Sequence, residues 1–190
     1  MEIKTPIEIS ARHIHISQKD LEALFGESHQ LHQIKQLSQP EEFAAEEVLS
    51  IEANGKNFAD VRIVGPIREE TQVEISKTDA VFLGANPPVK LSGDLENSLP
   101  VKIIGPNGEI DLDRGLIIAM RHIHCATDEA VNLNLKNGDI VSVKIEGGRG
   151  LVFDNVVVRV NDNYKLAMHI DTDEGNAAGI NKIGEGTIIK

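Results

Sequence analysis

The chain has 190 residues, a net charge of −11 at pH 7, and 41% hydrophobic residues, with only 3% aromatic residues and no Trp. This length supports one large or two small globular domains, and the aliphatic composition favours strands. The negative net charge excludes a general affinity for nucleic acid or anionic membranes, because both require clustered Lys and Arg. The single cysteine, Cys125, excludes an intrachain disulfide and is typical of a reducing compartment, so we expect a cytoplasmic protein.

Residues 1–6 lack the apolar core of a signal peptide, and no apolar run in the chain is long enough to span a bilayer. We therefore expect neither secretion nor a membrane partner. The expected partners are small molecules, and an anionic one would need a local positive site made by Arg, Lys or a metal ion.

The first predicted strand, residues 7–16, carries a motif that returns later in the chain. The sequence Arg-His-Ile-His occupies residues 12–15 and again residues 121–124. In an extended strand, side chains at i and i+2 point to the same face, so each copy of the motif places two imidazoles side by side.

After the first motif, Ser17 is predicted to cap a short helix that ends at Gly26. Residues 27–47 carry only a weak pattern and predict no definite element. Within that stretch, His29 and His32 have no partner recognisable from the sequence, so we interpret them as surface residues.

Residues 48–75 alternate β-branched runs with turn dipeptides, including Asn54-Gly55, which is typical of a small β domain. The second half repeats these parts, since residues 101–106 resemble residues 61–66. We therefore predict a mainly β protein of two small β-barrel domains related by internal duplication, with short helices.

The predicted domains are residues 1–97, with the N-terminal helix, and residues 98–190. Each domain need not be one continuous segment, because in duplicated barrels a terminal strand of one half can pair with strands of the other half. The N-terminal strand, residues 2–11, can therefore pair with the second half instead of the first.

Aligning the two halves places Glu74 opposite His169, so each half offers a pair of histidines and one further ligand. The predicted ligand sets are His13, His15 and Glu74 in one half and His122, His124 and His169 in the other. Three such ligands hold Zn²⁺ tetrahedrally and leave one position open for chemistry. The alternative is that the histidines are hydrogen-bonded polar residues at a barrel mouth.

Arg68 lies in a turn that leads to the strand carrying Glu74, where a guanidinium can grip a phosphate bidentately. The alternative for Arg68 is a solvated charge beside Glu69 and Glu70. Arg12 and Arg121 point away from the first histidine of each motif and are interpreted as structural ion-pair partners. Cys125 is interpreted as a buried apolar cysteine rather than a nucleophile.

Several stretches together resemble a known family. They are Ser10-Ala11-Arg12-His13-Ile14-His15, the run from Gly65-Pro66-Ile67-Arg68 through Glu74 to Thr78-Asp79-Ala80, Ser92-Gly93-Asp94-Leu95, and Arg121-His122-Ile123-His124 with the later His169. This set, which covers nearly the whole chain, closely resembles the PduL-type phosphate acyltransferases, also called phosphate propanoyltransferases or phosphotransacylases.

The resemblance implies a two-barrel enzyme with two zinc ions that interconverts an acyl-CoA and phosphate with an acyl phosphate and CoA. It assigns the two ligand sets named above to the two zinc ions and Arg68 to the phosphate. Lys35, Arg62 and Asn176 are weaker candidates for contacts with CoA. Neither acyl preference nor oligomeric state follows from the sequence.

Members of this family that are packaged in bacterial microcompartments carry an N-terminal extension, whereas this chain begins only one strand ahead of the first motif. Either the protein is a free cytoplasmic form, which fits acetyl-CoA, or an extension has been removed, which fits propanoyl-CoA. Two other functions stay open: a dinuclear metal-dependent hydrolase that uses a metal-bound water, and a non-enzymatic, metal-stabilised binding module.

Overall fold

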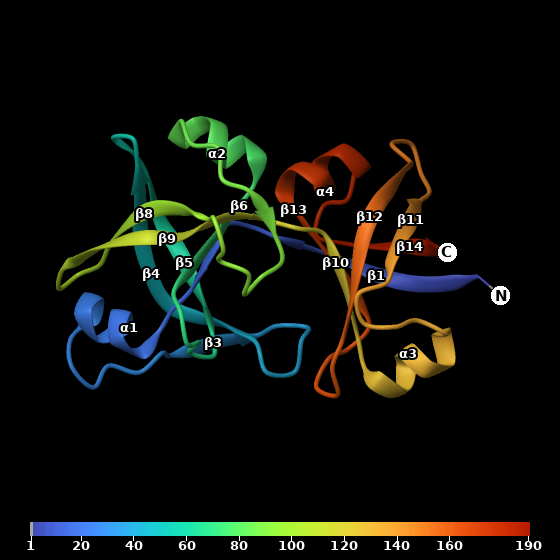
Figure 1. Ribbon diagram of the computed structural model, residues 1–190, viewed down its shortest axis with the longest axis horizontal. Helices are drawn as coiled ribbons and strands as arrows, with labels where there is room; N and C mark the ends of the chain where they lie inside the picture. The colour runs from blue at the N-terminus through green and yellow to red at the C-terminus, as the bar shows by residue number, and fades with distance from the viewer. Residues whose placement is uncertain (1) are drawn as a thin grey trace. The chain divides into compact units, whose positions relative to one another are not determined.

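The computed structural model describes residues 2–190 and is mainly β, with short helices between the strands (Figure 1). The chain divides into two compact units. We call Arg12–Ala119 the first barrel, and the segment up to Ala11 together with Met120–Lys190 the second barrel. No helix among residues 2–190 is both long enough and apolar enough to cross a membrane.

Six strands of the first barrel pair in a closed ring, in the order β4-β5-β2-β6-β9-β8 and back to β4. They are β2 His13–His15, β4 Phe43–Ala53, β5 Lys56–Gly65, β6 Gln72–Ile75, β8 Leu99–Ile104 and β9 Glu109–Ala119. Two short strands extend the ring at its margins: β3 (Gln33–Gln36) pairs with β4, and β7 (Val89–Lys90) pairs with β9.

The second barrel is also a closed ring, in the order β1-β13-β10-β12-β11-β14. Its strands are β1 Ile3–Ser10, β10 His122–Cys125, β11 Ile140–Ile145, β12 Leu151–Val160, β13 Ala167–Asp171 and β14 Ile183–Ile189. The pairing repeats that of the first barrel: β2 is parallel to β5 and antiparallel to β6, and β10 is parallel to β12 and antiparallel to β13. The predicted fold of two small duplicated barrels is therefore confirmed.

The strand that precedes each histidine motif belongs to the other barrel. Strand β1 runs parallel to β13 and antiparallel to β14, and Figure 1 shows it in dark blue among the orange and red strands of the second barrel. Strand β9 occupies the equivalent place in the first barrel, parallel to β6 and antiparallel to β8. The chain thus changes barrels directly before each motif, at Ala11 and at Ala119. Residue 97, the sequence-derived boundary, lies between β7 and β8 within the first barrel.

A short helix follows each strand that carries a site residue. The helices are α1 Gln18–Phe25 after β2, α2 Lys77–Leu83 after β6, α3 Thr127–Leu133 after β10, and α4 Thr172–Ala178 after β13. Ser17, Ser76 and Asp171 cap three of them by accepting a hydrogen bond from the backbone N–H of the third helical residue. Helix α3 begins after Ala126, which has no side-chain acceptor, so this helix lacks an N-cap hydrogen bond.

Both barrels have aliphatic cores, as the composition predicts. Ile14, at the centre of β2, is fully buried in the first core and packs with Val73 of β6. Ile123, at the centre of β10, is fully buried in the second core. Since neighbouring residues of a strand face opposite ways, the histidines on either side of Ile14 and Ile123 lie on the other face of each strand.

The missing cap of α3 generates a prediction about stability. Ala126→Ser should raise the free energy of unfolding by about 0.5–1 kcal/mol, because the backbone at Ala126 is already extended and Glu129 already accepts from the Ala126 N–H. Ser76→Ala should lower it by about 1 kcal/mol, because the buried cap of α2 is lost. Urea denaturation followed by circular dichroism measures both changes. Shifts of the same sign in the two variants would contradict this account of the caps.

Candidate functional site

The register between β2 and β6 brings the first ligand set together. His13 pairs directly with Glu74 across the two antiparallel strands, and Ile14 pairs with Val73. Because Ile14 and Val73 both face the core, His13, His15 and Glu74 share the opposite face. All three are well buried, His15 and Glu74 almost completely.

The donor atoms of this set have the spacing of a metal site. His13 Nε2 lies 3.2 Å from His15 Nε2 and 3.7 Å from Glu74 Oε2, and His15 Nε2 lies 3.6 Å from Glu74 Oε1. Ligand atoms bound to one tetrahedral Zn²⁺ are about 3.3–3.4 Å apart, given metal–ligand bonds of about 2.0–2.1 Å. The observed spacings bracket this value, so two imidazoles and a carboxylate fit a single ion.

The protonation states also suit a cation. Burial lowers the pKa of His15 well below its usual range, and the neighbouring His13 and Arg68 lower it further. Burial alone would raise the pKa of Glu74, but the neighbouring His13 and His15 lower it well below its usual range. At neutral pH, His15 is therefore neutral and Glu74 is ionised, which are the forms that bind metal.

The tautomer of His15 is set by its backbone partner. His15 Nδ1 lies 3.1 Å from the carbonyl oxygen of Val64, which can only accept, so Nδ1 carries the proton. Nε2 then presents its lone pair toward His13 and Glu74. Metal-bound histidines are commonly oriented by such a hydrogen bond from the other ring nitrogen.

A hydrogen-bond network connects Arg68 to Glu74. Arg68 Nη1 donates to Ser92 Oγ over 2.8 Å, and Gln72 Nε2 donates both to Ser92 Oγ over 3.0 Å and to Glu74 Oε1 over 2.5 Å. Arg68 Nη2 also donates to Glu42 Oε1 over 3.2 Å. Arg68 is therefore held beside the buried ligand set by Ser92 and Gln72.

Sequence reasoning missed Gln72 and Ser92. Gln72 lies two residues before Glu74 and shares its face of β6, so strand alternation was a usable signal for it. Ser92 lies in the Ser-Gly-Asp stretch of the resemblance, but only the fold brings it to Arg68.

The second ligand set is gathered as three imidazoles. His122 pairs with His169 across β10 and β13, and the ring centroids of His122, His124 and His169 are 4.6–5.4 Å apart. His122 Nδ1 donates to the carbonyl of Met120 over 2.8 Å, which leaves Nε2 as the ligand atom. Among residues 2–190, this set is looser than the first, whose donor atoms all lie within 4.8 Å of one another.

The arginine that begins each motif forms a structural ion pair, as the sequence analysis predicts. Arg12 Nη2 lies 2.6 Å from Asp79 Oδ1, and Arg121 Nε lies 2.6 Å from Glu174 Oε1. Asp79 and Glu174 are the equivalent N3 residues of α2 and α4. Each pair therefore ties a histidine motif to the helix that follows its third ligand.

The remaining sequence candidates lie in different settings. Lys35, on β3, is exposed. The Arg62 guanidinium donates to the carbonyl oxygens of Ala45 and Glu46, and Asn176 lies in α4. Lys35 and Arg62 belong to the first barrel and Asn176 to the second.

Cys125 is fully buried in the second core. Burial, with Glu129 and Asp128 nearby, raises the pKa of its thiol to about 11. The thiol is protonated at neutral pH, which agrees with an apolar cysteine rather than a nucleophile.

The interpretation of His29 and His32 as surface residues without partners is wrong in one respect. His32 is exposed, but both rings contact the buried carboxylate of Glu47. The partner, Glu47, lies on β4, whereas the two histidines lie on the connection before β3, so the sequence pattern gave no signal for this contact.

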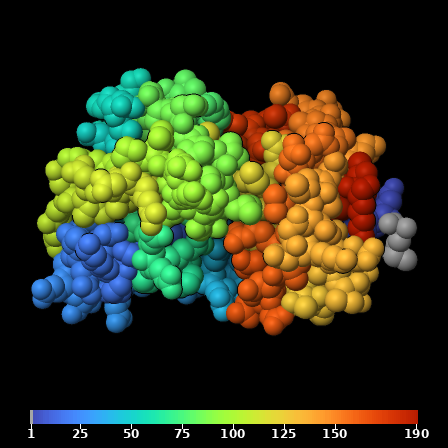
Figure 2. All heavy atoms as spheres, in the orientation of Figure 1, coloured from blue at the N-terminus to red at the C-terminus, as the bar shows by residue number. Residues whose placement is uncertain are grey.

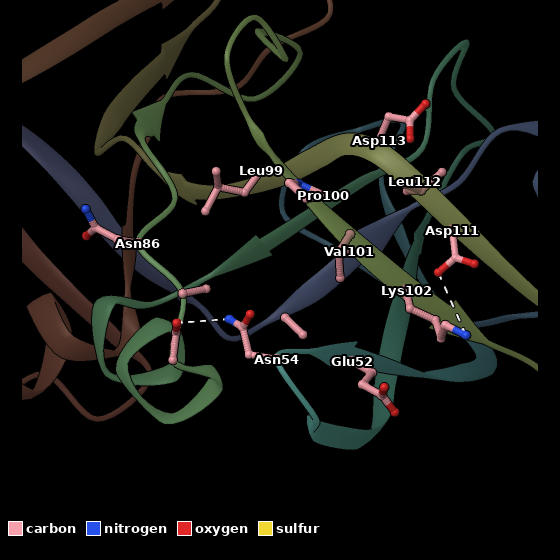
Figure 3. Close-up of a pocket in the computed structure, with 13 residues that line it drawn as sticks. Glu52, Asn54, Asn86, Leu99, Pro100, Val101, Lys102, Asp111, Leu112 and Asp113 are labelled. Carbon is pink, nitrogen blue, oxygen red and sulfur yellow. Dashed lines mark hydrogen bonds and ion pairs between the residues drawn. The ribbon is translucent and has the colours of Figure 1, made fainter.

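The first barrel also has an open cavity of about 530 Å³. Figure 3 shows Asn54 bonded to the backbone of Gly84, and Lys102 paired with Asp111, along its wall. None of the site residues predicted from the sequence lines this cavity. Its lining includes Lys102, whose charge is paired with Glu109 and Asp111.

The comparisons with known proteins identify the family of this chain. The family model for phosphate propanoyltransferase matches residues 6–181. A phosphate propanoyltransferase of Thermotoga maritima is 48% identical over 92% of this chain and 84% of its own length. Those of Clostridioides difficile and Salmonella typhimurium are 46% and 45% identical, over 97% and 92% of this chain and 87% and 83% of their own lengths. The chain is therefore an acyltransferase that belongs to the phosphate propanoyltransferase family.

Proposed function

We propose that the protein interconverts a short-chain acyl-CoA and phosphate with the acyl phosphate and CoA. Propanoyl-CoA is the first substrate to test, because the relatives are named for propanoyl transfer, and acetyl-CoA is the second. The observation that carries the proposal is the buried set His13, His15 and Glu74, joined through Gln72 and Ser92 to the guanidinium of Arg68.

In the proposed reaction, an oxygen of HPO₄²⁻ attacks the thioester carbonyl carbon, a C–O bond forms, and the C–S bond breaks. The proton of the phosphate passes to the departing CoA sulfur. Because phosphate attacks the thioester directly, no covalent enzyme intermediate is required. Arg68 is proposed to bind two phosphate oxygens through its planar guanidinium and to orient the nucleophile. Ser92 fixes the position of that guanidinium through the 2.8 Å bond from Nη1.

We propose Zn²⁺ at His13, His15 and Glu74 and a second Zn²⁺ at His122, His124 and His169. Both donor sets are of the kind that Zn²⁺ prefers and leave a coordination position open. When bound, such an ion supplies Lewis-acid chemistry, neutralising phosphate charge or the negative charge that develops on the carbonyl oxygen. Gln72 holds the Glu74 carboxylate in its ligating orientation through the 2.5 Å hydrogen bond.

CoA carries several phosphate groups and needs local positive charge on this acidic protein. Lys35, Arg62 and Asn176 are the proposed contacts. Lys35 offers an exposed ammonium, whereas Arg62 would have to exchange its hydrogen bonds to two backbone carbonyls.

The first test is whether CoA release requires phosphate. With propanoyl-CoA or acetyl-CoA as substrate, we expect free thiol to appear only when phosphate is present, together with acyl phosphate trapped by hydroxylamine. The reason is that phosphate is the proposed nucleophile and Arg68 its proposed binding group, because a guanidinium binds an oxyanion bidentately. A thiol assay with and without phosphate measures this. Phosphate-independent release would favour the metal-dependent hydrolase.

Arg68 generates the second test. Arg68→Ala should lower kcat/KM for phosphate by about 10- to 100-fold, since a charge-assisted hydrogen bond contributes about 1.5–3 kcal/mol. Arg68→Lys should recover only part of the loss, because an ammonium cannot bind bidentately. Initial rates at varied phosphate measure the effect. Arg114→Ala is the matched control, because that exposed arginine pairs with exposed Glu70, and an equal loss in this variant would contradict the assignment.

The ligand set generates the third test. Glu74→Gln should lower the bound metal by one equivalent per chain and abolish most of the activity, because the set loses its anionic ligand. Elemental analysis and activity are measured on the same sample, with circular dichroism to verify the fold. Glu70→Gln, at an exposed position just before β6, is the control. Unchanged metal content in the Glu74 variant would remove Glu74 from the site.

A further inference from the structure

A second cluster of histidines and a carboxylate lies elsewhere on the first barrel, and the proposed reaction makes no use of it. His29 and His32 lie on the connection between α1 and β3, and Glu47 lies on β4. The backbone N–H of Glu46 donates to the carbonyl of His32 over 2.7 Å, which fixes this connection against β4. In Figure 2, the blue segment that contains α1 lies at the surface on the face shown.

Both imidazoles converge on one carboxylate oxygen. His29 Nε2 lies 2.9 Å and His32 Nδ1 lies 2.7 Å from Glu47 Oε1, and the three donor atoms all lie within 4.8 Å of one another. The Glu47 side chain is only 5% exposed, whereas that of His32 is 66% exposed. The cluster therefore has a buried anionic base and an outer side that is open to water.

The orientation of these groups is fixed from several directions. The backbone N–H of His32 donates to both oxygens of Glu47, at 3.2 and 3.1 Å. The ring of His29 stacks on Phe25 at a centroid distance of 4.8 Å and an interplanar angle of 18°. Little side-chain entropy would be lost on binding an ion, because the rings and the carboxylate are already ordered.

The geometry needs only a small adjustment to hold an ion. Ligand atoms around tetrahedral Zn²⁺ are about 3.3–3.4 Å apart, so each imidazole nitrogen would have to move roughly half an ångström away from Glu47 Oε1. The proton on each of these nitrogens would move to the other ring nitrogen, giving the neutral tautomer that presents a lone pair. Water on the exposed side of His32 can complete the coordination.

We propose that His29, His32 and Glu47 form a further binding site for a divalent transition-metal ion, with Zn²⁺ as the preferred ion. Two imidazoles and one carboxylate are donors that Zn²⁺, Co²⁺ and Ni²⁺ accept. The ion joins the connection after α1 to β4. This proposal does not rest on the proposed acyl transfer, because none of its ligands belongs to the two sets near the histidine motifs.

The test compares metal binding and hydrogen exchange in the full-length chain. The protein is stripped with a chelator and titrated with Zn²⁺, and with Co²⁺ to follow visible absorption. We expect His32→Ala to bind one equivalent fewer than the wild type. We also expect Zn²⁺ to slow exchange in peptides covering residues 26–36 of the wild type but not of His32→Ala.

Gln30→Ala is the matched control, because this exposed residue lies between the two histidines and should leave both readouts unchanged. Glu47→Gln is the second variant, since its side-chain amide can keep a hydrogen bond to the connection while removing the anionic ligand, and it should also lose one equivalent. Equal metal content in the wild type and His32→Ala, with no effect of Zn²⁺ on residues 26–36, would overturn the proposal. The cluster would then serve only to attach the connection after α1 to β4 through hydrogen bonds.

Discussion

The register between β2 and β6 is the constraint on which the first ligand set depends. Ile14 and Val73 face each other in the core, and that pairing requires His13 to lie opposite Glu74 on the other face. A slip of one residue would turn the carboxylate of Glu74 into an aliphatic interior, where an uncompensated charge is very costly. Burial of the aliphatic face therefore specifies the geometry of the polar face. His13, His15 and Glu74 are positioned by the strand pairing and need no further interaction to bring them together.

Duplication repeats this frame with one chemical difference. In both barrels the arginine that begins the motif pairs with the N3 acid of the helix after the third ligand, and in both the third ligand lies across an antiparallel pair of strands. The third residue is Glu74 in one barrel and His169 in the other. With a divalent ion bound as proposed, the first set would carry one positive charge and the second set two. The set without a carboxylate would polarise a bound oxygen more strongly, so the two sets differ in their chemistry.

The histidine pairs followed from strand alternation, and alignment of the two halves placed Glu74 opposite His169, because both the alternation and the repeated motif are visible in the local sequence. The aliphatic cores were expected from the composition. The sequence analysis allowed residues 2–11 to pair with the second half but set the boundary at residue 97 and did not locate the barrel change at Ala119. Strand β1 pairs with β13 and β14, which lie far along the chain, so no local pattern determines its partners. The same reason explains why Ser92 beside Arg68 and Glu47 beside His32 were missed. Ser92 and Arg68 both lie outside the strands, and His32 lies on the connection before β3, so neither periodicity nor spacing signals these contacts.

The setting of Arg68 bears on how an acidic protein can bind an anion. Glu42 accepts one hydrogen bond from Arg68 at 3.2 Å, and both side chains are close to a third exposed. An ion pair with this much access to water contributes little, so its replacement by another oxyanion costs little. The bond to Ser92 lies on the other terminal nitrogen and does not have to break. If Arg68 binds phosphate as proposed, Glu42 therefore holds the guanidinium in place beforehand and yields when the dianion arrives, while Ser92 keeps the orientation. Preorganisation of this kind reduces the entropy lost on binding.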